Sequence, residues 1–149
     1  MRNRLVALAA ATLALASFGL AGCSSTDAGT TTSQAAVDAV AAPSAPERVD
    51  VERFAEVVAS SQSIVIDVRT PEEFAEGHLE GAVNYNVEGP DFAAQIAALD
   101  PAGVYAVYCR SGNRSQVAVA AMQQAGINGI YELQTGYTAW QEAGYPVVY

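Results

Sequence analysis

Lysine is absent from this chain of 149 residues. Its basic side chains are seven arginines and one histidine. Sixteen acidic residues outweigh them, and the formal net charge is −9. So acidic a chain argues against binding to nucleic acid and against electrostatic attachment to anionic lipid. The scarcity of positive charge makes Arg110 and Arg114 conspicuous, because both lie in one short segment.

Histidine and cysteine are almost as scarce, with one histidine, His78, and two cysteines, Cys23 and Cys109. These residues cannot supply a metal site with the usual ligand spacing, so we expect no bound metal. The chain also lacks the glycine patterns that bind nucleotide phosphates. We therefore expect no cofactor.

The first residues have the pattern of an export signal. Arg2 and Arg4 precede an apolar run from Leu5 to Leu20. The following Leu20-Ala21-Gly22-Cys23 resembles the bacterial lipobox, which implies cleavage before Cys23 and lipid attachment to its sulfur. The alternative is an uncleaved anchor, since the apolar run is just long enough to span a bilayer.

Three segments follow from this interpretation: a signal peptide at 1–22, a lipidated cysteine and tether at 23–48, and a domain at 49–149. The tether is rich in small and polar residues without an aromatic, which predicts disorder. We expect the protein to be exported and held by its lipid on the outer side of the bacterial cell membrane. A lipidated Cys23 would leave Cys109 without a disulfide partner, and its surroundings then favour a reactive thiol over an inert one.

Helices and strands are expected to alternate through the domain. Capping signals at Asp50, Thr70 and Asp91 each precede a helix, and Pro71 with Glu73 completes a capping box at the second of them. Apolar runs predict strands at 64–68, 82–85, 104–108 and 129–133, and the last two helices are expected at 115–125 and 136–143. This order predicts an α/β fold with a mainly parallel sheet, helices on both faces and ligands at the carboxyl ends of the strands.

We expect the rest of the domain to position the loop that follows the strand 104–108. It begins at Cys109 and continues through Arg110, Ser111, Gly112, Asn113, Arg114 and Ser115 into a helix. Free cysteine is only slightly ionised at neutral pH, because its pKa is about 8.5. We expect the loop amides, the helix N-terminus and the two arginines to stabilise an exposed thiolate and to hold an anion. Gly112 would allow the tight curl, and Ser115 would cap the helix.

Four segments, in order, resemble the motifs of single-domain rhodaneses; they are Ile66–Phe74, Glu76–Asn84, Tyr108–Ser115, and Gly136–Trp140 with Gly144–Val147. The resemblance implies the rhodanese-like three-layer sandwich and a sulfurtransferase. Cys109 would take the outer sulfur of thiosulfate or a similar donor as a persulfide. It would then pass that sulfur to cyanide, a small thiol or a protein thiol. The family usually has two glycines before the last helix, where this chain has Thr135-Gly136.

Several neighbours of the loop have competing interpretations. Asp67 and Arg69 could tune the site, but we favour Asp67 as a buried acceptor and Arg69 as an ion-pair partner of Glu73. His78 is expected to be structural, and Tyr137 and Trp140 are expected in the core. The resemblance assigns substrate contact to Arg110 and bracing of the loop to Arg114.

Two other functions remain open. A non-catalytic module could use the Cys109 thiol to sense oxidants or partners. A cysteine phosphatase or arsenate reductase is disfavoured, because four residues separate Cys109 from Arg114 and phosphatase loops have five.

Overall fold

The computed structural model describes residues 40–149. The expected signal peptide, the attachment residue Cys23 and the tether up to residue 39 lie outside the described residues. Within residues 40–149, no helix combines the length and the apolar character needed to cross a membrane.

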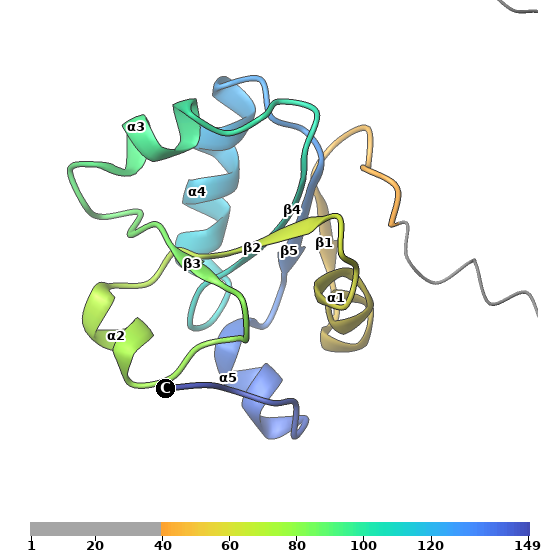
Figure 1. Cartoon of the computed structure of the whole chain (residues 1–149), viewed down its shortest axis with the longest axis vertical. Coiled ribbons are helices and arrows are strands. Elements are labelled where there is room, and N and C mark those ends of the chain that lie inside the picture. Colours follow the sequence, from red (N-terminus) through yellow and green to blue (C-terminus); the bar gives the residue numbers. More distant parts are fainter. Residues whose placement is uncertain (1–39) are drawn as a thin grey trace, which may run out of the picture. The chain divides into compact units, whose positions relative to one another are not determined.

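The centre of the domain is a sheet of five strands in the order β1-β5-β4-β2-β3. The strands are β1 Glu47–Val49, β2 Ser63–Asp67, β3 Val83–Asn84, β4 Val104–Tyr108 and β5 Ile130–Leu133. All neighbouring strands pair in parallel, so their carboxyl ends meet at one edge of the sheet. The strand β4 lies in the middle and feeds the cysteine loop (Figure 1).

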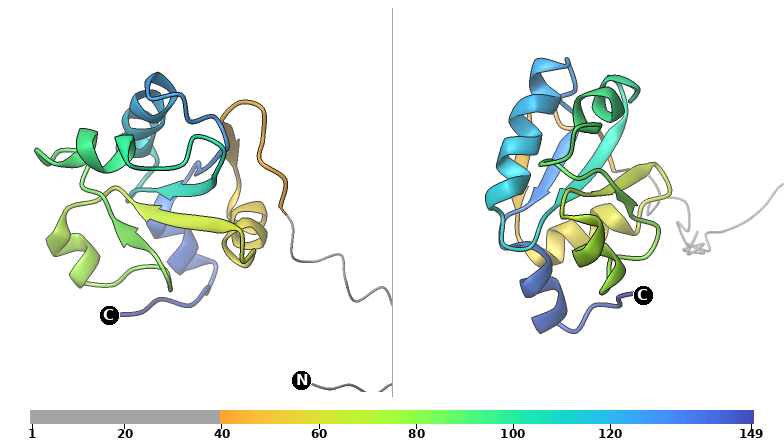
Figure 2. Two further views of the ribbon diagram at one scale, coloured as in Figure 1. Left: turned by 45° about the horizontal axis from the view of Figure 1, so that its top comes forward. Right: turned by 90° about the vertical axis from the view of Figure 1, so that its left-hand side faces the viewer.

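Helices cover both faces of this sheet (Figures 1 and 2). The helices α1 Val51–Val58 and α5 Gly136–Glu142 pack on one face, and α3 Phe92–Ala97 and α4 Asn113–Gln124 pack on the other. The short helix α2 Pro71–Ala75 follows β2. This arrangement confirms the α/β fold with a parallel sheet between two helical layers.

Alternation along β4 divides the core into two halves. Tyr105, Val107 and Cys109 belong to the cluster beneath α3 and α4, whereas Ala106 and Tyr108 belong to the cluster beneath α1 and α5. Every residue of β4 is buried. A strand that is covered on both faces has to be apolar throughout, which is why its sequence is a continuous apolar run.

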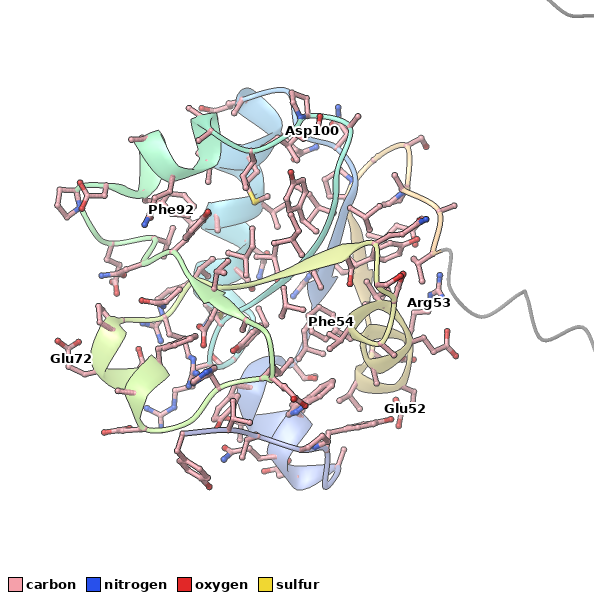
Figure 3. All side chains as sticks on the ribbon, in the orientation of Figure 1. Glu52, Arg53, Phe54, Glu72, Phe92 and Asp100 are labelled. Atoms are coloured by element: carbon pink, nitrogen blue, oxygen red, sulfur yellow. The ribbon has the colours of Figure 1, made fainter. Side chains whose placement is uncertain are left out.

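Figure 3 shows the same division in the side chains of the outer layers. Phe54 on α1 and Phe92 on α3 are both buried against the sheet, from opposite faces. Glu72, in the first turn of α2, is exposed and points away from the domain.

Of the caps predicted at Asp50, Thr70 and Asp91, the first two form and the third does not. The carboxylate of Asp50 accepts a hydrogen bond from the Arg53 amide, and Thr70 and Glu73 complete the predicted capping box. Asp91 makes no side-chain cap, because its backbone is already helical (φ −91°, ψ −8°) instead of extended.

The first strand extends the sheet beyond the predicted start of the domain. Residues 47 and 48 were expected in the tether, but they form β1 and pair with β5. Arg48 is fixed there by an ion pair with Glu132, 84 residues later in the chain. A tether from residue 23 therefore ends before Glu47.

Candidate active site

Cys109 follows β4 directly, at the carboxyl edge of the sheet between β2 and β5. The start of α5 packs against its loop from one side. The amide of Tyr137 donates to the Cys109 carbonyl oxygen at 2.8 Å, and the amide of Thr138 donates to the Arg110 carbonyl oxygen at 3.2 Å. The loop is therefore held by a helix that begins 27 residues later in the sequence.

The sulfur of Cys109 is turned into the loop. The amide of Gly112 donates to Sγ at 3.2 Å, and Ser115 Oγ lies 3.5 Å from Sγ. The residue is only 1% exposed, so the expectation of an exposed thiol was wrong. The loop therefore curls over the sulfur, with the Gly112 amide directed at it.

Gly112 makes this curl possible and also begins the helix. Its φ is +87°, a conformation that costs other residues energy, and it is the N-cap of α4. The helix therefore starts at Asn113, two residues before the predicted start. Ser115 does not cap the helix as expected, since it lies inside the first turn with its hydroxyl directed at Glu132.

The single glycine before α5 occupies the position where the backbone requires one. Gly136 has φ +71°, and a Cβ there would lie 2.5 Å from backbone atoms of Arg110 and Ser111. Thr135 has φ −100°, which any residue can adopt, and its side chain is exposed. The departure from the two-glycine pattern therefore falls where the turn tolerates a side chain.

A buried carboxylate lies next to the Cys109 loop, and sequence reasoning missed it. Ser115 Oγ donates to Glu132 Oε1 at 2.6 Å, and Arg48 Nε donates to Glu132 Oε2 at 2.6 Å. Glu132 is 2% exposed, although it lies in β5 among apolar neighbours. A glutamate within a predicted buried strand was the available signal, because such a charge requires a partner.

Arg114 connects the loop to α2. Its guanidinium donates to both oxygens of Glu73, at 2.7 and 2.8 Å, and a weaker contact of 3.4 Å reaches Glu88. The hydrogen bonds from Arg114 lower the pKa of Glu73, and those with Glu73 raise the pKa of Arg114. This geometry agrees with the bracing role assigned to Arg114.

Arg69 is also engaged in structure, but with a different partner from the one predicted. It forms a buried ion pair with Asp67 and donates to the Gly77 carbonyl oxygen at 2.7 Å. Its guanidinium also lies over the Tyr137 ring, 4.1 Å from the centroid. The predicted pairing with Glu73 was wrong, because Asp67, two residues away at the end of β2, accepts from both the amide and the side chain of Arg69.

His78 makes contacts that suit a structural residue. Its Nδ1 lies 3.0 Å from the Phe74 carbonyl oxygen, and its ring stacks on Phe74 with 3.7 Å between the centroids. Its backbone pairs with Val148 near the end of the chain. Tyr137 and Trp140 are buried, as predicted.

A pocket of about 310 Å³ opens beside the loop. Its lining contains four charged residues, Arg69, Arg110, Glu73 and Glu76, together with Tyr137, Thr138 and Gln141. Arg110 is exposed, as are Ser111 and Asn113 in the loop. Residues 40–149 contain no cluster of three side chains that could hold a metal ion.

The site and the fold have counterparts in known proteins. The rhodanese-like domain family matches residues 50–143. A relative described as thiosulfate sulfurtransferase 16, chloroplastic, from Arabidopsis thaliana is 38% identical over 91 residues, which cover 54% of this chain and 76% of the relative. Thiosulfate sulfurtransferase GlpE of Pseudomonas aeruginosa is 37% identical over 82 residues, covering 55% of this chain and 72% of that protein. The crystal structure of a rhodanese-related protein from Thermoplasma volcanium, 31% identical, superposes with a TM-score of 0.61 over 68% of this chain and 97% of that one.

Proposed function

Because the chain belongs to the rhodanese-like family, we propose that it is a sulfurtransferase that carries a sulfane sulfur on Cys109. The observation that carries the proposal is the contact between the Gly112 amide and Cys109 Sγ, at 3.2 Å, in a loop that starts a helix. An amide and a helix N-terminus both favour negative charge on this sulfur. Negative charge is required on the thiolate that attacks and on the persulfide that forms.

The reaction has two halves. The Cys109 thiolate attacks the outer sulfur of thiosulfate, a new S–S bond forms, and the S–S bond of the donor breaks as sulfite leaves with its electron pair. The acceptor, cyanide or a small or protein thiol, then attacks the outer sulfur of the persulfide. Cys109 leaves as the thiolate, so the enzyme returns to its starting state.

The pocket beside the loop suits the charged end of the donor. Arg110 is exposed at its lining, whereas the guanidinium groups of Arg69 and Arg114 are engaged by Asp67 and Glu73. A guanidinium pairs well with an oxyanion, because it offers several N–H donors in one plane. We assign the sulfonate oxygens of thiosulfate to Arg110.

The size of the loop favours sulfur over phosphate. Four residues separate Cys109 from Arg114, and Cys109 is 1% exposed. A single sulfur atom needs less room at the centre of the loop than a tetrahedral phosphoryl group with its oxygens. The loop is therefore better suited to sulfur transfer than to a phosphatase reaction.

The direct test is to incubate the purified full-length protein with thiosulfate and to follow the peptide that contains Cys109 by mass spectrometry. We expect a gain of about 32 Da on Cys109, as in persulfidation, and release of thiocyanate when cyanide is added. The variant Cys109→Ser should show neither. If the wild-type protein gains no sulfur, or if Cys109→Ser transfers sulfur at the wild-type rate, the proposal is wrong.

We also propose that the protein is exported and anchored to the bacterial cell membrane by lipid on Cys23. The support is the sequence around Cys23 alone. Expression in bacteria with a labelled fatty acid should label the wild-type protein and place it in the membrane fraction, and Cys23→Ala should lose the label. Retention of the N-terminal 22 residues in the mature wild-type protein would contradict the proposal.

A further inference from the structure

A chain of hydrogen bonds leads from the reactive sulfur to a buried carboxylate. Cys109 Sγ lies 3.5 Å from Ser115 Oγ, and Ser115 Oγ lies 2.6 Å from Glu132 Oε1. Three different elements supply these residues, namely the end of β4, the first turn of α4, and β5. Burying a carboxylate is costly. We therefore expect a function for Glu132, which two successive hydrogen bonds connect to Cys109.

The direction of each hydrogen bond follows from the number of protons. A serine hydroxyl has one proton, and the short contact with Glu132 commits that proton to the carboxylate. The Ser115 oxygen then presents its lone pairs to Cys109. The thiol proton of Cys109 therefore points at Ser115, while the amide of Gly112 approaches the same sulfur.

We propose that Glu132 takes up, through Ser115, the proton that Cys109 loses when its sulfur becomes a thiolate. The S–H bond of Cys109 breaks and its proton passes to Ser115 Oγ. The original hydroxyl proton of Ser115 passes at the same time to Glu132 Oε1. The products are a thiolate, a neutral carboxylic acid and an unchanged serine, so no proton is exchanged with solvent.

The same path runs backwards when Cys109 leaves the persulfide. Glu132 returns its proton to Ser115 Oγ while the hydroxyl proton that Ser115 already carries passes to the sulfur. Within the proposed sulfur transfer, Glu132 thus stores one proton between the two half-reactions. It never touches the substrate, and it acts only through Ser115.

The charged groups around this path are few. Arg48 on β1 forms an ion pair with Glu132 Oε2. Arg114 on α4 acts electrostatically on Cys109, and Glu73 on α2 partly neutralises it. The side chains that β2, the residue after it and α3 contribute to this half of the core are apolar: Ile66, Val68, Phe92 and Ile96.

The proposal predicts an unusual pH profile for the thiolate. The two arrangements, thiol with carboxylate and thiolate with carboxylic acid, contain the same number of protons. Their ratio is therefore independent of pH as long as the pair holds one proton. A cysteine without such a store instead gains thiolate roughly tenfold for each pH unit below its titration midpoint.

The test measures alkylation of Cys109 by iodoacetamide, a neutral reagent that needs the thiolate but no sulfur donor. The full-length protein and its variants are compared from about pH 5.5 to about pH 7.5, below the usual titration of cysteine, and the rate is read from the Cys109 peptide. Glu132→Gln removes the proton acceptor, and Ser115→Ala interrupts the path while leaving the carboxylate in place. Glu142→Gln is the matched control, because Glu142 is an exposed glutamate on α5.

We expect the wild-type and Glu142→Gln rates to change less than about threefold over this range, because the shared proton sets the thiolate population. The rates of Glu132→Gln and Ser115→Ala should rise roughly tenfold per pH unit and should be at least about tenfold below wild type at the acid end. A purely structural role would multiply the rate by one factor at every pH. If the wild-type rate rises as steeply as that of Glu132→Gln, or if Ser115→Ala keeps the flat profile, the proposal is wrong.

This test separates the proton path from the proposed function on which it rests. A flat wild-type profile that both variants lose, together with no sulfur gain from thiosulfate, would keep the path and reject the sulfurtransferase. If the protein transfers sulfur but the alkylation rates of wild type and variants change with pH in the same way, the sulfurtransferase is kept and the proton path is rejected. Thermal unfolding of each variant checks its fold, and Ser115→Ala decides the question if Glu132→Gln does not fold.

Discussion

Replacing Gly136 by alanine should damage both stability and the Cys109 loop. Gly136 has φ +71°, where alanine costs about 1–2 kcal/mol. The new methyl group would also lie 2.5 Å from the carbonyl carbon and oxygen of Arg110 and from the Ser111 amide nitrogen. These are backbone atoms, so the loop itself has to move, and overpacking of this kind costs about 1–3 kcal/mol. The sum predicts a loss of about 2–5 kcal/mol in the free energy of unfolding.

A second glycine isolates the effect of the contact. Gly126, which follows α4, has φ +87°, and a methyl group there would meet nothing within 4 Å. Gly126→Ala carries the same backbone strain, about 1–2 kcal/mol, and the same gain from a less flexible unfolded chain. The difference between the two variants therefore measures the contact with the loop.

The assays are urea unfolding and the rate of sulfur gain on Cys109 from thiosulfate. Gly136→Ala should be about 1–3 kcal/mol less stable than Gly126→Ala, and it should load sulfur more slowly because Arg110 and Ser111 are displaced. Gly126→Ala should load sulfur at the wild-type rate. Equal stabilities for the two variants, or normal loading by Gly136→Ala, would refute the argument that α5 sets the shape of the loop.

Three further predictions concern the charges around the site. Arg114 holds the pKa of Glu73 below its ordinary value of 4.5, so their ion pair stabilises the fold above that pH and is lost as the pH falls through the lower folded value. Glu73→Gln should therefore reduce the free energy of unfolding by about 1 kcal/mol at neutral pH, with a difference that shrinks in acid, as urea unfolding over a pH series would show. Asp67→Asn should cost about 3–5 kcal/mol in the same assay, because Arg69 is left buried without a counter-charge. Arg110→Gln should slow sulfur gain at low thiosulfate concentration and leave the melting temperature unchanged, since Arg110 is exposed.

The first two of these predictions have controls, and the third has an outcome that would contradict it. Glu56→Gln removes the exposed ion pair between Glu56 and Arg53 and should cost less than Glu73→Gln. Replacing Asp67 and Arg69 together by apolar residues should cost less than Asp67→Asn alone, because no charge then stays buried. A uniform slowing of Arg110→Gln at saturating thiosulfate would contradict its assignment to substrate binding.

Several helices and strands could be predicted from short stretches of the sequence. The continuous apolar run 104–108 became the central strand, and the capping box at Thr70 and Glu73 formed as predicted. These features depend on neighbours in the sequence, so a short window contains the information. The strand at 47–49 was missed because its stability comes from pairing with β5 and from Glu132, both more than 80 residues away.

The surroundings of the sulfur could be predicted only in part. The position of Cys109 between strand and helix follows from the sequence, and so does the need for Gly112 in the curl. The partner of Arg69 was predicted from helical spacing, but the buried carboxylate of Asp67 at the end of β2 competes better for its guanidinium. Burial of the thiol depends on α5, whose backbone closes against the loop.

By itself, the sequence determined the fold class, the position of Cys109 between a strand and a helix, and the length of the Cys109 loop, because each depends on residue types and their spacing along the chain. Only the tertiary structure decided which charges meet. It placed Arg114 on Glu73, Arg48 on Glu132, and Glu132 within reach of Ser115 beside the sulfur. Pairing of charges depends on the distances that folding creates between distant segments, and no local pattern records those distances.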